Sequence, residues 1–247
     1  MEDKVQAAFP GAITNGSLAE KVSNKLDSHG FGKDNTQLAT SLCSDEVNRE
    51  LDDEFRKMYG WNFSMGGLAG FPFGGITSFG AMAHHIPTGG SCLVIYGPHV
   101  GVDNEGAVGK INRRGRPGAS GACCGSANAA AAYVQCVVAG EKEAAEAPTD
   151  PVDAQQSWVC SALLPHGKRV AAAENPAIEL PHALFDSQDE IMMKIVNAAC
   201  GEVAGEGKIA LVGGLQINTP AGTPDYFMIK KFDILNNKGE VIESVAA

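Results

Sequence analysis

The sequence has no long apolar run and little positive charge. No apolar segment reaches the roughly 20 residues that a membrane-spanning helix needs, and residues 1–15 lack the apolar core of a signal peptide. Lys and Arg total 19 against 29 Asp and Glu, and the net charge of −10 argues against a general nucleic-acid binder. We therefore expect a soluble protein with no membrane span and no nucleic-acid partner, whose abrupt start leaves room for a targeting segment upstream.

The cysteine pattern does not suit a disulfide-stabilised scaffold. There are seven cysteines in 247 residues, an odd number and far less dense than in a small disulfide-stabilised secreted domain. Four of them lie within apolar runs, where a free thiol usually behaves as a small core residue. The other three, Cys43, Cys123 and Cys124, lie beside polar residues or glycine where a strand or helix is expected to begin or end. These three are therefore the candidates for chemistry.

Hydrophobic residues, by contrast, make up 44% of the chain, which is enough for one large buried core. Apolar runs typical of buried strands, such as Cys92–Tyr96 and Lys208–Ile217, alternate with segments of helical periodicity. We expect an α/β fold with a mostly parallel central sheet flanked by helices. A C-terminal hairpin is predicted from Tyr226–Leu235 and Val241–Val245. A single domain spanning residues 1–247 is the simplest organisation.

Cys43 lies where a short β-prone segment, Thr36–Leu42, gives way to a helix that begins at about Asp45. Open α/β sheets place their sites at such strand ends, and a helix N-terminus stabilises a nearby thiolate. Asp45 and Arg49 are four residues apart, so on this helix their side chains would face the same side and could pair. The same pattern is also typical of a helix cap with an ordinary surface ion pair.

His99 closely follows the buried strand Cys92–Tyr96, so we expect it at the carboxyl edge of the sheet. If the two strands are neighbours, it shares a crevice with Cys43. Cys123 and Cys124 stand at the start of an alanine-rich helix. Two thiolates and an imidazole favour zinc over hard cations, and three protein ligands leave a fourth position for water, as in catalytic zinc sites. Considered alone, a histidine at a strand end is more often a polar residue with an ordinary hydrogen-bond partner than a metal ligand. Two adjacent cysteines, considered alone, can also be packing residues with no chemical role.

In combination these motifs resemble the zinc signature of β-class carbonic anhydrases. The shared features are Cys-x-Asp at residues 43–45 with a nearby arginine, Gly-Pro-His at 97–99, and a later Cys-Gly. The chain departs from that signature because the arginine follows the aspartate by four residues rather than two, and the second cysteine follows the histidine by 25 rather than three. With Ala-His-His-Ile-Pro at 83–87 and Gly-Ala-Cys-Cys-Gly at 121–125, the chain is similar to the limiting-CO2-inducible B (LCIB) family, also called θ-class carbonic anhydrases, from about Gly30 onward.

The resemblance implies a β-carbonic-anhydrase-like fold and the zinc-dependent, reversible hydration of CO2 to bicarbonate. It implies that zinc is held by Cys43, His99 and either Cys123 or Cys124. We favour Cys124, because the glycine that follows it matches the Cys-Gly of the β-class signature.

The resemblance also implies a catalytic dyad formed by Asp45 and Arg49. Asp45 would orient the zinc-activated water toward CO2, and Arg49 would hold Asp45 away from the zinc. His84 and His85 could relay protons to buffer, because imidazole titrates near neutral pH. Our candidate for that relay is His85, although one of the pair could instead contact a neighbouring subunit.

Two further features could contribute to binding of CO2 or bicarbonate, but each also has an ordinary structural explanation. Phe71 and Phe73, in a glycine-rich segment, could form an apolar wall for CO2, but they can equally pack beneath their own loop. The basic run at residues 113–116 could attract bicarbonate, but a solvated turn is usual for such a charge cluster.

The family resemblance further implies dimerisation, with an identical or a related subunit. It implies a part in a carbon-concentrating mechanism in or near the chloroplast, with a transit peptide that is not part of this chain.

Two other functions are also compatible with these residues. One is a catalytically silent zinc-binding scaffold of a carbon-concentrating complex. The other uses Cys43 or Cys124 as a thiol nucleophile with His99, as in amide hydrolases.

Overall fold

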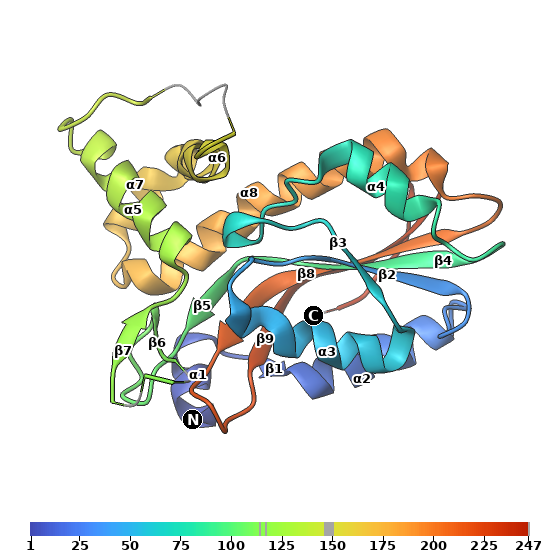
Figure 1. The fold of residues 1–247 in the computed structure, drawn as a ribbon, viewed down its shortest axis with the longest axis horizontal. Coiled ribbons are helices and arrows are strands. Elements are labelled where there is room, and N and C mark those ends of the chain that lie inside the picture. The colour runs from blue at the N-terminus through green and yellow to red at the C-terminus, as the bar shows by residue number, and fades with distance from the viewer. Residues whose placement is uncertain (114, 117, 146–150, 247) are drawn as a thin grey trace.

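The computed structural model describes residues 1–113, 115–116, 118–145 and 151–246. A central sheet runs through it (Figure 1). Its strands lie in the order β1 (Ile13–Thr14), β9 (Tyr226–Asn236), β8 (Lys208–Asn218), β4 (Ser91–Tyr96), β2 (Thr36–Ser41) and β3 (Asn62–Ser64), while β5 (His99–Gly101) pairs with β8, and β10 (Val241–Ser244) pairs with β9.

The strands at the centre of the sheet are parallel. β2 pairs in parallel with β3 and β4, and β8 pairs in parallel with β4 and β5. β9 is antiparallel to β8, β1 and β10, and it forms the C-terminal hairpin with β10. The expected α/β class, with a mostly parallel sheet and a C-terminal hairpin, is confirmed.

Helices cover both faces of the sheet (Figure 1). One face carries α2 (Asn15–Asp27) and α3 (Arg49–Tyr59), and the other carries α1 (Glu2–Ala8), α4 (Gly75–Ala83) and α8 (Pro176–Ala199). β4 shows the effect of this double cover: Leu93 and Ile95 join the core beneath α2 and α3, whereas Val94 and Tyr96 join the core beneath α4 and α8. A strand that is buried on both faces needs apolar residues at successive positions, and β4 has them.

A third group of helices lies beside the first half of α8, at the upper left of Figure 1. It consists of α5 (Gly125–Val138), α6 (Ala154–Leu163) and α7 (Gly167–Ala172). Short 3-10 helices lie at Glu46–Asn48, Leu68–Gly70, Leu164–His166 and Cys200–Glu202, and a small antiparallel pair is formed by β6 (Lys110–Asn112) and β7 (Ser120–Ala122). The apolar cluster of these helices includes Cys43 and Cys124, so it covers the carboxyl edge of the parallel strands.

Gly97 interrupts the chain between β4 and β5, and the two strands pair with successive parts of β8. Its φ of +153° is rarely adopted by other residues, and a Cβ there would collide with the backbone carbonyl of Gly214 in β8. Glycine at this position therefore lets the chain pass close to β8 and continue to His99 at the edge of the sheet.

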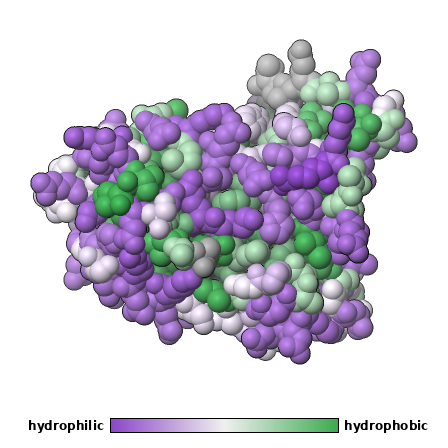
Figure 2. Space-filling model, turned by 180° about the vertical axis from the view of Figure 1, so that it is seen from behind, coloured by the Kyte–Doolittle hydropathy of each residue, from purple (hydrophilic) through white to green (hydrophobic). Residues whose placement is uncertain are grey.

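None of the helices in the described part of the chain is both long and apolar enough to cross a membrane. The face opposite that of Figure 1 is largely hydrophilic, with smaller apolar areas between the polar side chains (Figure 2).

Candidate metal centre

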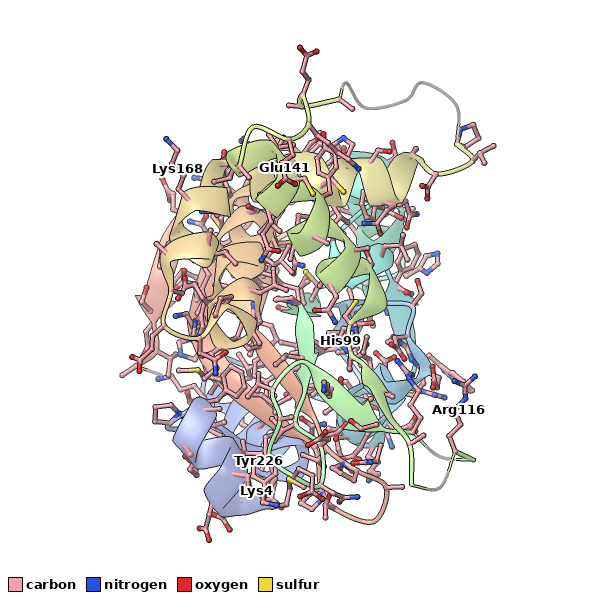
Figure 3. The ribbon with its side chains drawn as sticks, turned by 90° about the vertical axis from the view of Figure 1, so that its left-hand side faces the viewer. Lys4, His99, Arg116, Glu141, Lys168 and Tyr226 are labelled. Carbon is pink, nitrogen blue, oxygen red and sulfur yellow. The ribbon has the colours of Figure 1, made fainter. Side chains whose placement is uncertain are left out.

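Three segments bring metal-ligating side chains together at the carboxyl edge of the parallel strands. Cys43 follows the end of β2, His99 is the first residue of β5, and Cys124 is the N-cap of α5. All three are buried, and one potential ligand atom from each lies within 4.8 Å of the other two. Figure 3 shows His99 in the interior of the molecule, near the start of α5. The structure thus places the three predicted ligands side by side.

The spacing of the two sulfurs fits a shared tetrahedral ion better than a disulfide. The Sγ atoms of Cys43 and Cys124 lie 3.8 Å apart, and both cysteines are free. Two sulfurs bound to one tetrahedral zinc at about 2.3 Å are also separated by about 3.8 Å, whereas a disulfide needs about 2.0 Å. The pair is therefore held at the separation that a shared ion requires.

His99 presents one ring nitrogen without a partner. Its Nδ1 lies 2.8 Å from Oδ1 of Asn218, an atom that can only accept, so we assign Nδ1 as the donor. Nε2 is buried and has no hydrogen-bond partner among the described residues. A buried nitrogen without a partner costs free energy, and a metal ion would satisfy it. The residues present therefore fit a metal.

The buried cysteines and histidine shift one another's pKa values. The hydrogen bond with Cys124 lowers the pKa of Cys43 to about 4, against the opposing effect of burial, and the same bond raises the pKa of Cys124. Burial would lower the pKa of His99, but its contacts with Cys123, Cys124 and Cys43 raise that pKa well above its ordinary value. The cluster thus holds protons that a cation would displace, which leaves the thiolates and neutral imidazole that metal ligation needs.

Cys123 lies beside the same imidazole but contacts its other nitrogen. Its Sγ is 3.6 Å from Nδ1 of His99 and 3.8 Å from Oδ1 of Asn218. Potential ligand atoms of Asp45, His99 and Cys123 also lie within 4.8 Å of one another. Because Asn218 already engages Nδ1, we propose Cys124 rather than Cys123 as the third ligand.

Asp45 pairs with Arg113. Both of its carboxylate oxygens accept hydrogen bonds from the guanidinium, at 2.8 and 2.7 Å. Burial would raise the pKa of Asp45, but the bonds from Arg113 hold that pKa below its usual range. Arg113 also pairs with Glu46 at 2.6 Å. The carboxylate beside the cluster is therefore ionised and fixed in orientation.

The expected pairing of Asp45 with Arg49 does not occur. Asp45 stands before the first helical turn in an extended conformation, with φ −57° and ψ 132°, so four-residue helical spacing does not bring it onto the face of Arg49. Arg49 instead donates a hydrogen bond to the carbonyl of Cys43 at 2.8 Å and pairs with Asp52 at 2.6 Å. The partner that the sequence analysis assigned to Asp45 is corrected to Arg113.

The histidine pair at 84–85 lies at the other end of the sheet. Both side chains are exposed at the end of α4, and from there the chain enters β4 at its amino end. The ring of His85 packs edge-on against Phe63, with centroids 5.5 Å apart. A six-residue strand, about 20 Å long, thus lies between His85 and His99. Direct proton transfer from the cluster to His85 within one chain is not supported.

The cavity beside the cluster is narrow and largely apolar. It is lined by His99, the two adjacent cysteines and residues of β5, α5 and α8, including Val100, Ala127, Leu180 and Leu184. Its volume of about 10 Å³ is close to the space of one water molecule.

Phe71 and Phe73 do not line this cavity. Together with Trp158 they border a separate surface groove of about 330 Å³. The α8 residues of the cavity were not found from the sequence.

Comparison with known proteins identifies the family. Residues 12–236 match the family described as limiting CO2-inducible proteins B/C beta carbonic anhydrases. The chain belongs to this family. It is 47% identical to PtLCIB4, a homologue of the limiting CO2-inducible protein LCIB, with a TM-score of 0.94 over 100% of both chains. It is 19% identical to LCIB, with a TM-score of 0.73 over 97% of this chain and 96% of that chain, which shows the shared fold. No curated protein sequence matches the chain.

As a member of the limiting CO2-inducible B/C family, the chain has the carbonic-anhydrase type of fold that its motifs predict. Besides the α8 residues of the cavity, sequence reasoning missed two polar partners of the candidate site, Asn218 and Arg113. Asn218 follows the buried run Lys208–Ile217, so the strand-end argument that found His99 could also have found it. Arg113 was noted only as part of a basic loop, and no local pattern pointed to its partner.

Substitution of the proposed ligands should abolish metal binding. We expect the wild-type protein to bind one divalent metal ion per chain. The variants Cys43→Ser, His99→Ala and Cys124→Ser should lose this ion, because each substitution removes a donor from a three-ligand site. Cys123→Ser should retain it. Elemental analysis of the purified variants checks this, with Cys136→Ser as the control, because Cys136 is outside the cluster. Retention by Cys124→Ser together with loss in Cys123→Ser would reverse the assignment.

Proposed function

We propose that this chain catalyses the reversible hydration of CO2 to bicarbonate at a zinc ion held by Cys43, His99 and Cys124. The observation that supports this most directly is the buried pair of sulfurs 3.8 Å apart beside an imidazole nitrogen without a partner. Two sulfurs and one nitrogen are donors that zinc prefers, and three ligands are the number found in catalytic rather than structural sites. Membership of a family of carbonic-anhydrase type agrees with that chemistry.

Zinc in such a site supplies a nucleophile near neutral pH by lowering the pKa of a water molecule. The side chains of this protein would then orient the reaction. The ionised carboxylate of Asp45 can accept the hydrogen of the attacking water and direct an oxygen lone pair toward CO2. Arg113 occupies both carboxylate oxygens, so it keeps Asp45 from turning toward the metal ligands.

The apolar lining of the cavity is chemically suited to CO2, which is small and carries no net charge. Val100, Ala127, Leu180 and Leu184 line it together with His99. Apolar walls do not compete with water for hydrogen bonds, so they favour a neutral gas molecule over bicarbonate at this position.

A second candidate function is a zinc-binding scaffold without turnover. The tightness of the cavity, at about 10 Å³, favours it, because a site that holds no more than one water has little room for CO2 beside the nucleophile. The two functions share the same ligand set and differ only in whether the site admits substrate.

We also propose, from the family resemblance, that the protein acts in inorganic carbon handling within a carbon-concentrating mechanism of the chloroplast. We propose that the chain forms one domain and assembles as a homodimer or with a related subunit. Light scattering coupled to gel filtration measures the assembly directly.

A stopped-flow CO2-hydration assay tests the proposed activity. We expect the zinc-loaded protein to accelerate hydration, and both the chelated protein and His99→Ala to fall to the buffer rate, because the nucleophile depends on the ion. Cys136→Ser serves as the control and should keep wild-type turnover. Stoichiometric zinc with no acceleration would refute catalysis and leave the scaffold, whereas absence of any bound metal would favour the thiol-nucleophile alternative.

Removing the partner of Asp45 should slow turnover without removing zinc. We expect Arg113→Ala to lower kcat by about tenfold or more, because the carboxylate loses the bonds that fix it and is free to approach the ligands. Glu46→Gln, which removes the charge of the exposed partner of Arg113 and keeps the bonds between Arg113 and Asp45, should stay close to wild type. Steady-state kinetics with zinc analysis of the same samples checks this. Wild-type kcat in Arg113→Ala would contradict the role given to Arg113.

A further inference from the structure

We propose that Asn218 and Asp225 form a positioning pair that fixes the tautomer and direction of His99, so that Nε2 is presented to the two cysteines. The inference deepens the proposed function, on whose metal ligand set it rests. Neither residue contacts the cavity that we assign to the substrate, so they act through the histidine.

The contact between Asn218 and His99 is fully buried. Oδ1 of Asn218 lies 2.8 Å from Nδ1 of the imidazole, and the two side chains are 0% and 2% exposed. In such a position the ring cannot exchange this hydrogen bond for one to water, so the orientation of the amide decides which ring nitrogen carries the hydrogen.

The amide of Asn218 has only one orientation compatible with its surroundings. Its Nδ2 donates to Oδ2 of Asp225 at 2.9 Å and to the carbonyl of Val47 at 3.0 Å. A carbonyl and an ionised carboxylate can only accept, so turning the amide over would place its oxygen against two acceptors. Both hydrogens of Nδ2 are therefore used, and Oδ1 must face the imidazole.

Asp225 is itself held firmly. It is buried, and its Oδ1 accepts the backbone N–H of Thr219 at 2.7 Å. Burial raises the pKa of Asp225 to about 6, so above that pH the carboxylate is ionised and acts only as an acceptor. The backbone N–H of Asp225 donates to the carboxylate of Glu50 at 3.1 Å, which ties this loop to α3.

The side-chain amide of Asn218 also connects two segments that carry residues of the candidate metal centre. The Val47 carbonyl belongs to the turn that follows Cys43 and Asp45, whereas Asn218 ends β8 and faces His99 at the start of β5. One side chain thus sets the distance between the cysteine segment and the histidine. Partners of this kind, beyond the ligands, commonly tune metal affinity.

Zinc binding at pH 8 tests the pair independently of CO2 turnover. With zinc as the probe and a competing chelator, we expect Asn218→Ala to weaken affinity by about 10- to 100-fold and Asp225→Asn to weaken it less. In the double variant, Asp225→Asn should add nothing further, because Asp225 acts through Asn218. The control is Asn237→Ala. Asn237 also donates two hydrogen bonds from Nδ2, in this case to the backbone carbonyls of Val203 and Gly205, at the opposite end of β9.

Nitrogen-15 NMR of the zinc-loaded wild type provides a readout that needs no variant. We expect the His99 ring hydrogen on Nδ1 and the metal on Nε2. A hydrogen on Nε2 would overturn the inference, as would wild-type zinc affinity in Asn218→Ala or additive losses in the double variant. If zinc binds as expected but no CO2 is hydrated, the proposed catalysis fails while the positioning pair stands.

Discussion

Three potential metal-ligand atoms buried within 4.8 Å of one another set the main constraint on this molecule. The sulfurs of Cys43 and Cys124 and the Nε2 of His99 are closed off from solvent, and the cavity beside them is too small to hydrate all three. Buried polar groups without partners are costly. A single divalent ion accounts for the spacing of the sulfurs, the burial of the site and the lone nitrogen together.

Three polar groups around the cluster, in contrast, are each held by a hydrogen-bond partner. Arg113 holds Asp45, Asn218 holds Nδ1 of His99, and Arg49 holds the carbonyl of Cys43. These bonds join β2, β5, β8 and the loop after β6, which meet only in the folded chain. These bonds engage the neighbouring side chains and leave the two sulfurs and one nitrogen available to an ion.

The nearness of the candidate ligands Cys43 and His99 could be predicted from local features of the sequence. Cys43 follows the short β-prone segment that becomes β2, and His99 follows the apolar run that becomes β4. The sheet class followed from the same runs. The Asp45–Arg49 pairing failed because helical spacing applies only within a helix, and Asp45 stands before one. The contact of Asp45 with Arg113 depends on the path of the loop after β6, and local spacing does not specify such a path.

X-ray absorption at the zinc edge tests the central claim most directly. For the zinc-loaded protein, we predict a shell of two sulfurs at about 2.3 Å with nitrogen or oxygen neighbours at about 2.0–2.1 Å. A shell with no sulfur, or with any number of sulfurs other than two, would contradict the assignment of Cys43, His99 and Cys124 as the metal ligands.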